Sequence, residues 1–115
     1  MPIDIFLTLD VIEALENYIY KIRPPEEMRN KYDIVYKIDN QSIIIYEIRE
    51  HWKNKNEKLE IPIAKTTYIK AKKHWKIFWK QSDLNWHSYK PNPIVQDIKE
   101  FVKTIETDKT GCFWG

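Results

Sequence analysis

Residues 51–90 bring lysines and aromatic rings together in one stretch of the chain. They contain ten lysines, all three histidines and four of the five tryptophans, against three acidic residues. Ammonium groups neutralise phosphates, and exposed rings offer bases a flat surface for stacking. Strand alternation within residues 75–80 places Phe78 between Lys76 and Lys80 on one face. This combination predicts contact with nucleic acid.

The candidate binding residues lie in or beside residues 51–90, which we call the basic-aromatic segment. The opposite face of residues 75–80 carries Trp75, Ile77 and Trp79, which we expect in the core. Trp86 is expected there as well. Lysines beside a strand also protect its edge from aggregation, so ordinary packing and solvation compete with binding as an explanation. The candidates are Arg49, Trp52, Lys65, Lys76, Phe78, Lys80, His87 and Tyr89.

Aromatic residues at two places predict an alternative function, a protein–protein interaction module. Trp52 lies in a lysine-rich loop, and Phe113 and Trp114 stand just before the final Gly115. Such residues are enriched at binding hot spots. Alternatively, Trp52 folds over the sheet as a lid and the C-terminal rings pack on the domain. Packing of the C-terminal rings is the stronger expectation, because exposing large aromatic area is costly.

Paired carboxylates raise a minor alternative, an Mg²⁺-dependent nuclease. Glu47 and Arg49 share one strand face, and Asp33 or Asp39 lies on the neighbouring strand. Such enzymes hold the metal with carboxylates and use a lysine in activating water. Arginine replaces lysine poorly because it is not deprotonated in proteins. An ion pair of Glu47 or Glu50 with Arg49 or a cross-strand lysine explains the same pattern, so we lean towards a domain that is not an enzyme.

The remaining reactive side chains predict no metal site and no cofactor. The three histidines and Cys112 have irregular spacings, without the paired ligands of a zinc site. No glycine precedes Gly111, so the chain has no glycine-rich loop to cradle a nucleotide phosphate.

One helix and several strands must position these side chains. Apolar residues recur at helical spacing over residues 9–22, with Thr8 or Asp10 as the cap. Pro24 and Pro25 end this helix because proline lacks an N–H group. Pro62 is expected at a sheet edge or a strand start. Alternation and turn residues predict strands over residues 32–38, 43–49, 61–70, 75–80 and 85–89.

A second helix follows the strands, with Asn92 as its cap and Pro93 at its first position, and ends near Glu106. Strands in succession with short connections favour an antiparallel meander of four to five strands with the helices on one face. The predicted fold class is α+β. Residues 1–115 form a single domain, with an N-terminal helix, the meander, a C-terminal helix and a docked aromatic tail.

Composition is typical of a cytoplasmic domain. The 115 residues have a net charge of +2 and are 43% hydrophobic, and such a length allows a packed core. The single Cys112 cannot form an intrachain disulfide, which suits a reducing compartment. No apolar run approaches the roughly 18 residues that span a bilayer, and the N-terminus lacks a basic leader. We therefore expect nucleic acid or another protein as the partner, and no membrane.

Several motifs along the chain occur together in one family. They are YEIRE (46–50), Trp52, PIAK (62–65), WKIFWKQSDLNWHSY (75–89) and DKTGCFWG (108–115). With them the chain resembles the Domain of Unknown Function family 3024, small bacterial proteins that typically end in Asp-Pro-Thr-Gly, one variable residue and Phe-Trp-Gly. Here Lys109 stands in place of that proline, and Glu50 stands where a basic residue or proline is expected. The resemblance implies a compact bacterial domain and no particular activity.

The terminal motif also carries a structural prediction. Asp108 and Thr110 make a turn, and Gly111 supplies backbone torsions that other residues rarely adopt. Phe113 and Trp114 then pack onto the domain.

Overall fold

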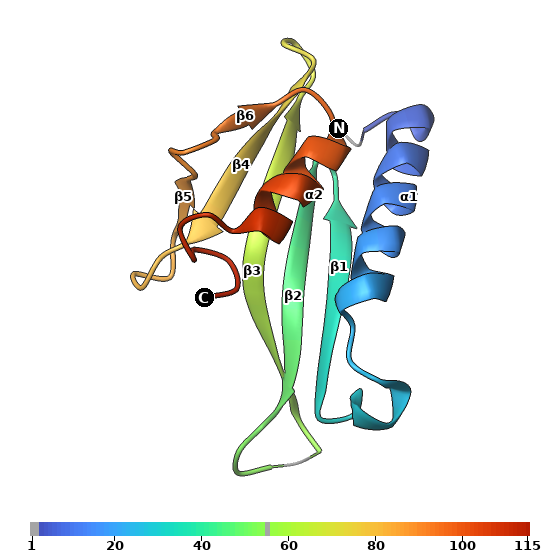
Figure 1. Ribbon diagram of the computed structural model, residues 1–115, viewed down its shortest axis with the longest axis vertical. Coiled ribbons are helices and arrows are strands. Elements are labelled where there is room, and N and C mark those ends of the chain that lie inside the picture. The colour runs from blue at the N-terminus through green and yellow to red at the C-terminus, as the bar shows by residue number, and fades with distance from the viewer. Residues whose placement is uncertain (1–2, 55) are drawn as a thin grey trace.

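The computed structural model describes residues 3–54 and 56–115 and has an α+β architecture (Figure 1). The predicted fold class is confirmed. Lys55, one lysine of the basic-aromatic segment, lies outside the described residues. No described helix has the length and apolar character needed to cross a membrane. The elements are α1 (Ile5–Ile22), η1 (Glu26–Met28), β1 (Tyr32–Asp39), β2 (Ser42–Glu50), β3 (Lys58–Ile69), β4 (His74–Lys80), β5 (Trp86–Ser88), β6 (Ile94–Val95) and α2 (Ile98–Thr107).

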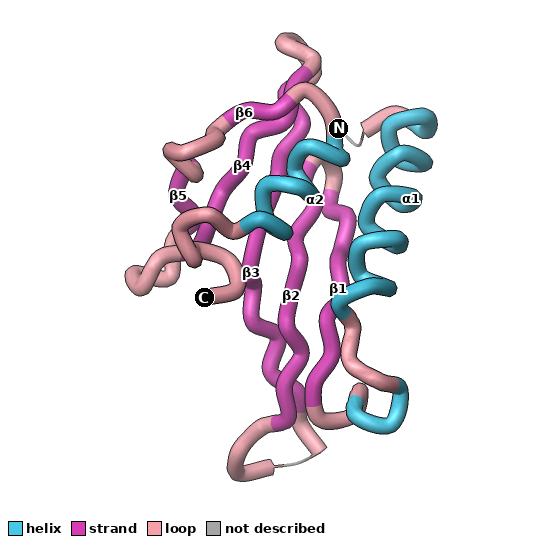
Figure 2. The backbone as a smooth tube through the Cα atoms, in the orientation of Figure 1, coloured by secondary structure: helices cyan, strands magenta, loops and turns pink. Residues whose placement is uncertain are grey.

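The sheet is the antiparallel meander that the short connections predict. Its strands follow one another in the order β1-β2-β3-β4-β5, and β6 pairs with β4. β5 lies opposite residues 78–80 of β4, whereas β6 lies opposite residues 75–76. The two short strands therefore line the same edge of β4. The hairpin of β2 and β3 extends beyond α1 and α2 at one end of the molecule (Figure 2).

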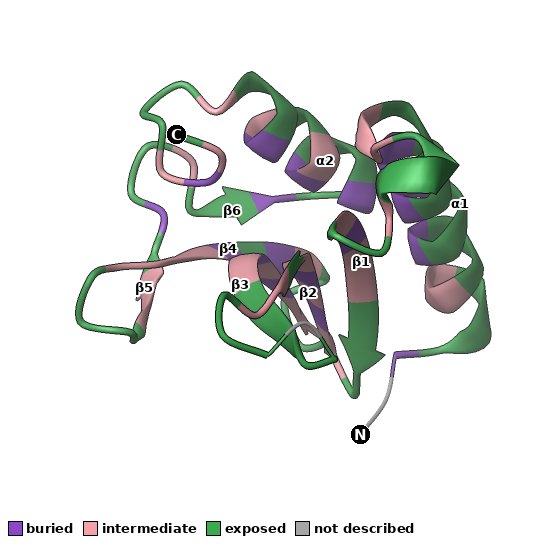
Figure 3. Cartoon of the chain, turned by 90° about the horizontal axis from the view of Figure 1, so that it is seen from below, coloured by how far each residue is buried: buried purple, intermediate pink, exposed green. Residues whose placement is uncertain are grey.

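Both α-helices cover one face of the sheet (Figure 3). The core lies between the helices and this face, and the predicted core positions Trp75 and Ile77 of β4 are buried in it. Trp79 packs against the core and is partly buried. The largest fully buried side chains are Trp75, Tyr89, Phe101, Leu15, Ile43, Ile45, Ile77 and Ile105.

Helix α1 begins one turn earlier than its buried stripe indicates. The prediction of a start near residue 9 with Thr8 or Asp10 as the cap was wrong, because Asp4 is the N-cap and its carboxylate accepts from the Leu7 N–H at 2.9 Å. Ile5 and Phe6 form the first turn but are 68% and 77% exposed. Apolar periodicity reports only the packed part of a helix, so it does not find an exposed first turn.

Helix α2 begins later than predicted. The expected cap at Asn92 was wrong, because Asp97 is the N-cap and forms a capping box with Glu100. Residues 94–95 form β6 instead of a first helical turn. β5 pairs only with residues 78–80, and the Ile77 N–H donates to the Pro93 carbonyl at 3.0 Å. The rest of the β4 edge therefore pairs with residues 94–95, which the sequence alone assigned to the helix.

Pro62 lies inside β3 and not at its start, which was the predicted place. β3 begins at Lys58, and Pro62 stands opposite Tyr46 on β2. Ala64 stands opposite Ile45, so Ile63 is the extra residue of a bulge. A bulge accommodates proline in a sheet because the ladder hydrogen bonds are already interrupted there.

The aromatic tail is docked, as predicted. Phe113 is 5% exposed, and its ring centroid lies 4.8 Å from that of Tyr89. The Asp108 carboxylate accepts from the backbone N–H groups of Phe113 and Trp114 at 3.0 and 2.8 Å, while Gly111 has a φ of 70°. The Trp114 Nε1–H donates to the Tyr18 hydroxyl at 3.1 Å. The tail therefore contacts α1 through Tyr18 and the segment after β5 through Tyr89.

Candidate functional site

Among the described residues, no helix or strand covers the sheet face turned away from the helices (Figure 3), and the register of the strands places aromatic rings and lysines on it. We call it the outer face. Lys65 stands directly opposite Phe78, and Lys80 opposite Trp86, so these four side chains project on the same side. Trp75 and Ile77 of β4 point to the buried side. The outer face includes Asp33, Val35, Lys37, Ile44, Tyr46, Ile48, Glu50, Lys58, Glu60, Lys65, Thr67, Lys76, Phe78, Lys80 and Trp86.

Lys65 lies between two aromatic rings. Its Nζ is 5.7 Å from the ring centroid of Phe78 and 5.8 Å from that of Trp86. Lys80 Nζ lies 5.6 Å from the Trp86 centroid. The cross-strand register of β3, β4 and β5 produces this arrangement, because it sets each lysine beside a ring on the next strand. The two ammonium groups and two rings form one continuous cluster.

A second ring–lysine pair lies nearer the β1 edge. Lys37 Nζ is 4.9 Å from the Tyr46 centroid and 2.6 Å from the Glu60 carboxylate. The hydrogen bond with Glu60 raises the pKa of Lys37. The charge of Lys37 is therefore balanced by a neighbour. The ion pairs among the described residues include none with Lys65, Lys76 or Lys80, so no carboxylate in those pairs balances the charges of these three lysines.

The match to known proteins extends over nearly the whole of this fold. The profile of the family described as Domain of unknown function (DUF3024) matches residues 4–115. The chain belongs to this family. The resemblance that the terminal and internal motifs predict is confirmed, and the description of the DUF3024 family names no activity. No curated protein and no solved structure matches the chain. The function of this DUF3024 domain must therefore be inferred from its geometry.

The structure brings four of the eight candidate binding residues together. Lys65, Lys76, Phe78 and Lys80 all lie on the outer face. Trp52 lies elsewhere, in the loop between β2 and β3, where it is 77% exposed and Lys53 Nζ sits 4.7 Å from its ring centroid. It does not form a lid over the sheet.

The other three candidates are engaged away from the outer face. Arg49 lies on the helix-facing side of β2, where its Nε donates to Glu47 at 2.9 Å. His87 on β5 forms a hydrogen bond with Asp83, in which the His87 Nε2 and Asp83 Oδ2 atoms are 2.8 Å apart. Tyr89 is 2% exposed, and its hydroxyl lies 3.2 Å from Thr110 Oγ1. Tyr89 is therefore a core residue and is not exposed for binding.

Sequence reasoning missed two rings of the outer face. Trp86 was expected in the core, and that prediction was wrong, because its pairing opposite Lys80 turns it outward, where it is half-buried. A three-residue strand with one ring on each side carries no internal signal of its orientation. Tyr46 was detectable, since alternation groups it with Ile44 and Ile48 on one face of β2. Alternation alone does not show which of the two faces of β2 the helices cover.

The carboxylates of the nuclease alternative are not assembled. Glu47 is paired with Arg49 on the helix-facing side of the sheet, whereas Asp33 pairs in register with Ile48 and lies on the other side. Asp39 is exposed at the end of β1. Residues 3–54 and 56–115 contain no group of three histidine, cysteine or acidic side chains placed to share an ion.

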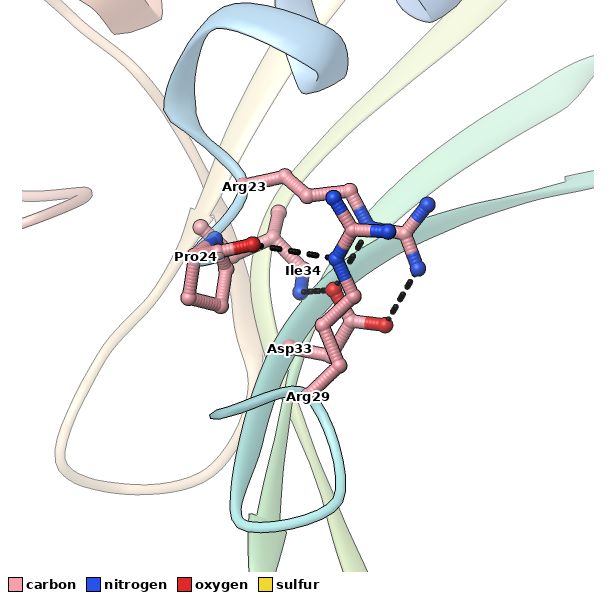
Figure 4. Close-up of polar contacts among 5 residues, drawn as sticks. All are labelled: Arg23, Pro24, Arg29, Asp33 and Ile34. Atoms are coloured by element: carbon pink, nitrogen blue, oxygen red, sulfur yellow. Dashed lines mark hydrogen bonds and ion pairs between the residues drawn. The ribbon is translucent and has the colours of Figure 1, made fainter. Parts of the chain in front are cut away.

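Arg23 and Asp33 close one end of the β1 edge (Figure 4). The Arg23 guanidinium donates to both Asp33 oxygens, at 2.9 and 2.7 Å, and the Ile34 N–H donates to Asp33 Oδ1 at 2.8 Å. Arg29 Nε donates to the Pro24 carbonyl beside them at 3.0 Å. Because the Asp33 carboxylate occupies the Ile34 N–H, this donor of the edge strand is less open to pairing with another chain.

Replacing Asp33 with asparagine is expected to lower the free energy of unfolding by about 1 kcal/mol at pH 7. The hydrogen bond from Arg23 lowers the pKa of Asp33. A carboxyl group with a lowered pKa stabilises the fold at pH values above its pKa in the unfolded chain, which is about 4. This stabilisation disappears as the pH falls through the pKa of the group in the folded protein. Urea denaturation of both proteins from pH 7 to pH 3 measures the difference. Asp39→Asn, at the exposed end of the same strand, is the control, and a difference independent of pH would contradict the assignment.

Proposed function

We propose that this domain binds single-stranded nucleic acid on the outer face. The observation that supports it most directly is the position of Lys65 between Phe78 and Trp86. A base stacks on a ring, and a phosphate pairs with an ammonium group. The cluster therefore presents rings for bases and an ammonium group for a phosphate side by side.

The shape and charge of the surface favour a single strand over a duplex. By register the rings lie on the sheet face that neither α1 nor α2 covers (Figure 3), and unpaired bases can be splayed out and stacked on such rings. Bases inside a duplex are already stacked and hidden. Lys65, Lys76 and Lys80 are unpaired among the described residues, so their charges are available to phosphates.

Salt dependence provides the test. Each phosphate neutralised on a single strand changes the slope of log K against log[salt] by about −0.7, so three lysines predict a slope near −2. Affinity for a fluorescein-labelled 12-nucleotide strand should then fall about 20-fold between 50 and 200 mM salt. The matching duplex should bind more weakly. No binding of the single strand at 50 mM salt would contradict the proposal.

A pair of charge-matched variants locates the contact. Lys76→Glu with Lys80→Glu reverses two outer-face charges and should weaken binding at least 10-fold, with a slope nearer zero. Lys99→Glu with Lys103→Glu changes net charge equally on α2, which lies on the other side of the sheet. The α2 variant should bind like the wild type. Equal losses in both variants would show that net charge, and not the outer face, drives binding.

Trp52 supports a second candidate function, a contact with another protein at the β2–β3 loop. It is 77% exposed and stands on a hairpin that projects beyond the helices (Figure 2). Exposed tryptophans are favoured anchors in interfaces. The Phe113 and Trp114 alternative loses support, because both residues pack on the domain. Trp52→Ala would then abolish capture of a protein partner while leaving oligonucleotide binding intact.

A further inference from the structure

The rings of Phe78 and Trp86 are not free in the unbound protein. Lys65 Nζ lies within 5.8 Å of both ring centroids, and Lys80 Nζ lies 5.6 Å from that of Trp86. A cation–π contact at a partly exposed site stabilises less than the stacking of a base does. A base can therefore displace the ammonium group from each ring.

The spacing of the two rings suits neighbouring nucleotides. Phe78 pairs with Ser88, and Trp86 lies two residues from Ser88 on the same strand. The two rings are thus diagonal neighbours across adjacent strands, about 7–8 Å apart at the backbone. One step of an extended single strand covers a comparable distance. Two consecutive bases can reach the two rings, and their shared phosphate then lies near Lys65.

We propose that Phe78, Lys65 and Trp86 form a site for two consecutive unpaired nucleotides. One base stacks on each ring, and the Lys65 ammonium group leaves the rings to pair with the phosphate that joins the two nucleotides. Lys80 pairs with the next phosphate beyond Trp86. This inference rests on the proposed function, because it specifies how the same outer face holds a single strand.

Abasic oligonucleotides test the two-nucleotide site. Four 10-nucleotide probes are compared at 50 mM salt: all thymine, fully abasic, two adjacent thymines in an abasic strand, and two thymines separated by three abasic positions. Stacking of one base contributes about 5- to 150-fold in affinity. The adjacent pair should bind at least about 5-fold more tightly than the separated pair, which engages one ring at a time. Equal affinities of these two probes would overturn the site.

Lys65→Met tests the role of the ammonium group, because it keeps an unbranched side chain and removes the charge. In the variant, the slope of log K against log[salt] should be about 0.7 less steep than in the wild type. The preference for adjacent thymines should persist. Lys99→Met on α2 is the matched control and should keep the wild-type slope. An unchanged slope in Lys65→Met would overturn the phosphate contact.

The outcomes separate this inference from the proposed function. If the all-thymine probe does not bind at 50 mM salt, both are wrong. If all four probes bind equally, phosphate contact on the outer face stands and the two-nucleotide site is wrong.

Discussion

Replacing Phe113 with alanine is expected to lower the free energy of unfolding by about 3–5 kcal/mol, the usual cost of removing a buried phenylalanine. The side chain is 5% exposed and packs on the Tyr89 ring at a centroid distance of 4.8 Å. A domain of this size is stabilised by roughly 5–15 kcal/mol in total, so the loss is a large share. Urea denaturation followed by tryptophan fluorescence measures it.

The neighbouring exposed residue supplies the control for this prediction. Lys109→Ala changes a solvated side chain in the same turn and should alter stability by no more than about 0.5 kcal/mol. Deleting residues 112–115 should destabilise at least as much as Phe113→Ala, because it also removes the hydrogen bond from Trp114 to Tyr18. A truncated chain that melts at the full-length temperature would mean that the tail is a recognition element and not part of the core.

The double variant Phe78→Ala with Trp86→Ala is expected to lower the affinity for single-stranded oligonucleotides about 100-fold. Each stacked base contributes about 1–3 kcal/mol, and both platforms disappear. Neither residue belongs to the packed core, so the fold should remain. The lysines are unchanged, so most of the salt dependence should persist. Fluorescence anisotropy with a labelled strand at several salt concentrations separates the two effects.

Trp52→Ala is the matched control for the ring variants. It also removes a large ring, but from the exposed β2–β3 loop and not from the outer face. Its oligonucleotide affinity should stay within about 2-fold of the wild type, since no stacking platform is lost. If Trp52→Ala weakens binding as much as the double variant does, the hairpin loop carries the contact and the outer face does not.

Much of the architecture follows from local pattern. The period-two runs on either side of residues 39–42 predict β1 and β2, and both strands form with nearly the expected bounds. The alternation of Lys76, Phe78 and Lys80 against Trp75 and Ile77 predicts which side of β4 is buried. Alternation is a property of one strand and needs no partner, so these features were predictable.

Features that depend on competition between segments were not predictable. Asn92 and Asp97 are both good helix caps by residue type. The choice falls to Asp97 because the β4 edge beyond β5 pairs with residues 94–95. Likewise, Pro62 argued for a strand start, and a bulge opposite Tyr46 allowed the strand to continue through it. In each case a hydrogen-bond partner distant in sequence outweighed the local signal.

The sequence by itself determined the charge asymmetry, the α+β class, the family and the buried face of β4. The docking of the terminal rings also followed from composition, because two large aromatic side chains are costly to leave in water. The tertiary structure alone decided which rings and lysines meet. Trp86 joins Lys65 only through the register of β3, β4 and β5. Cross-strand contacts depend on pairing between strands, and alternation within one strand does not specify that pairing.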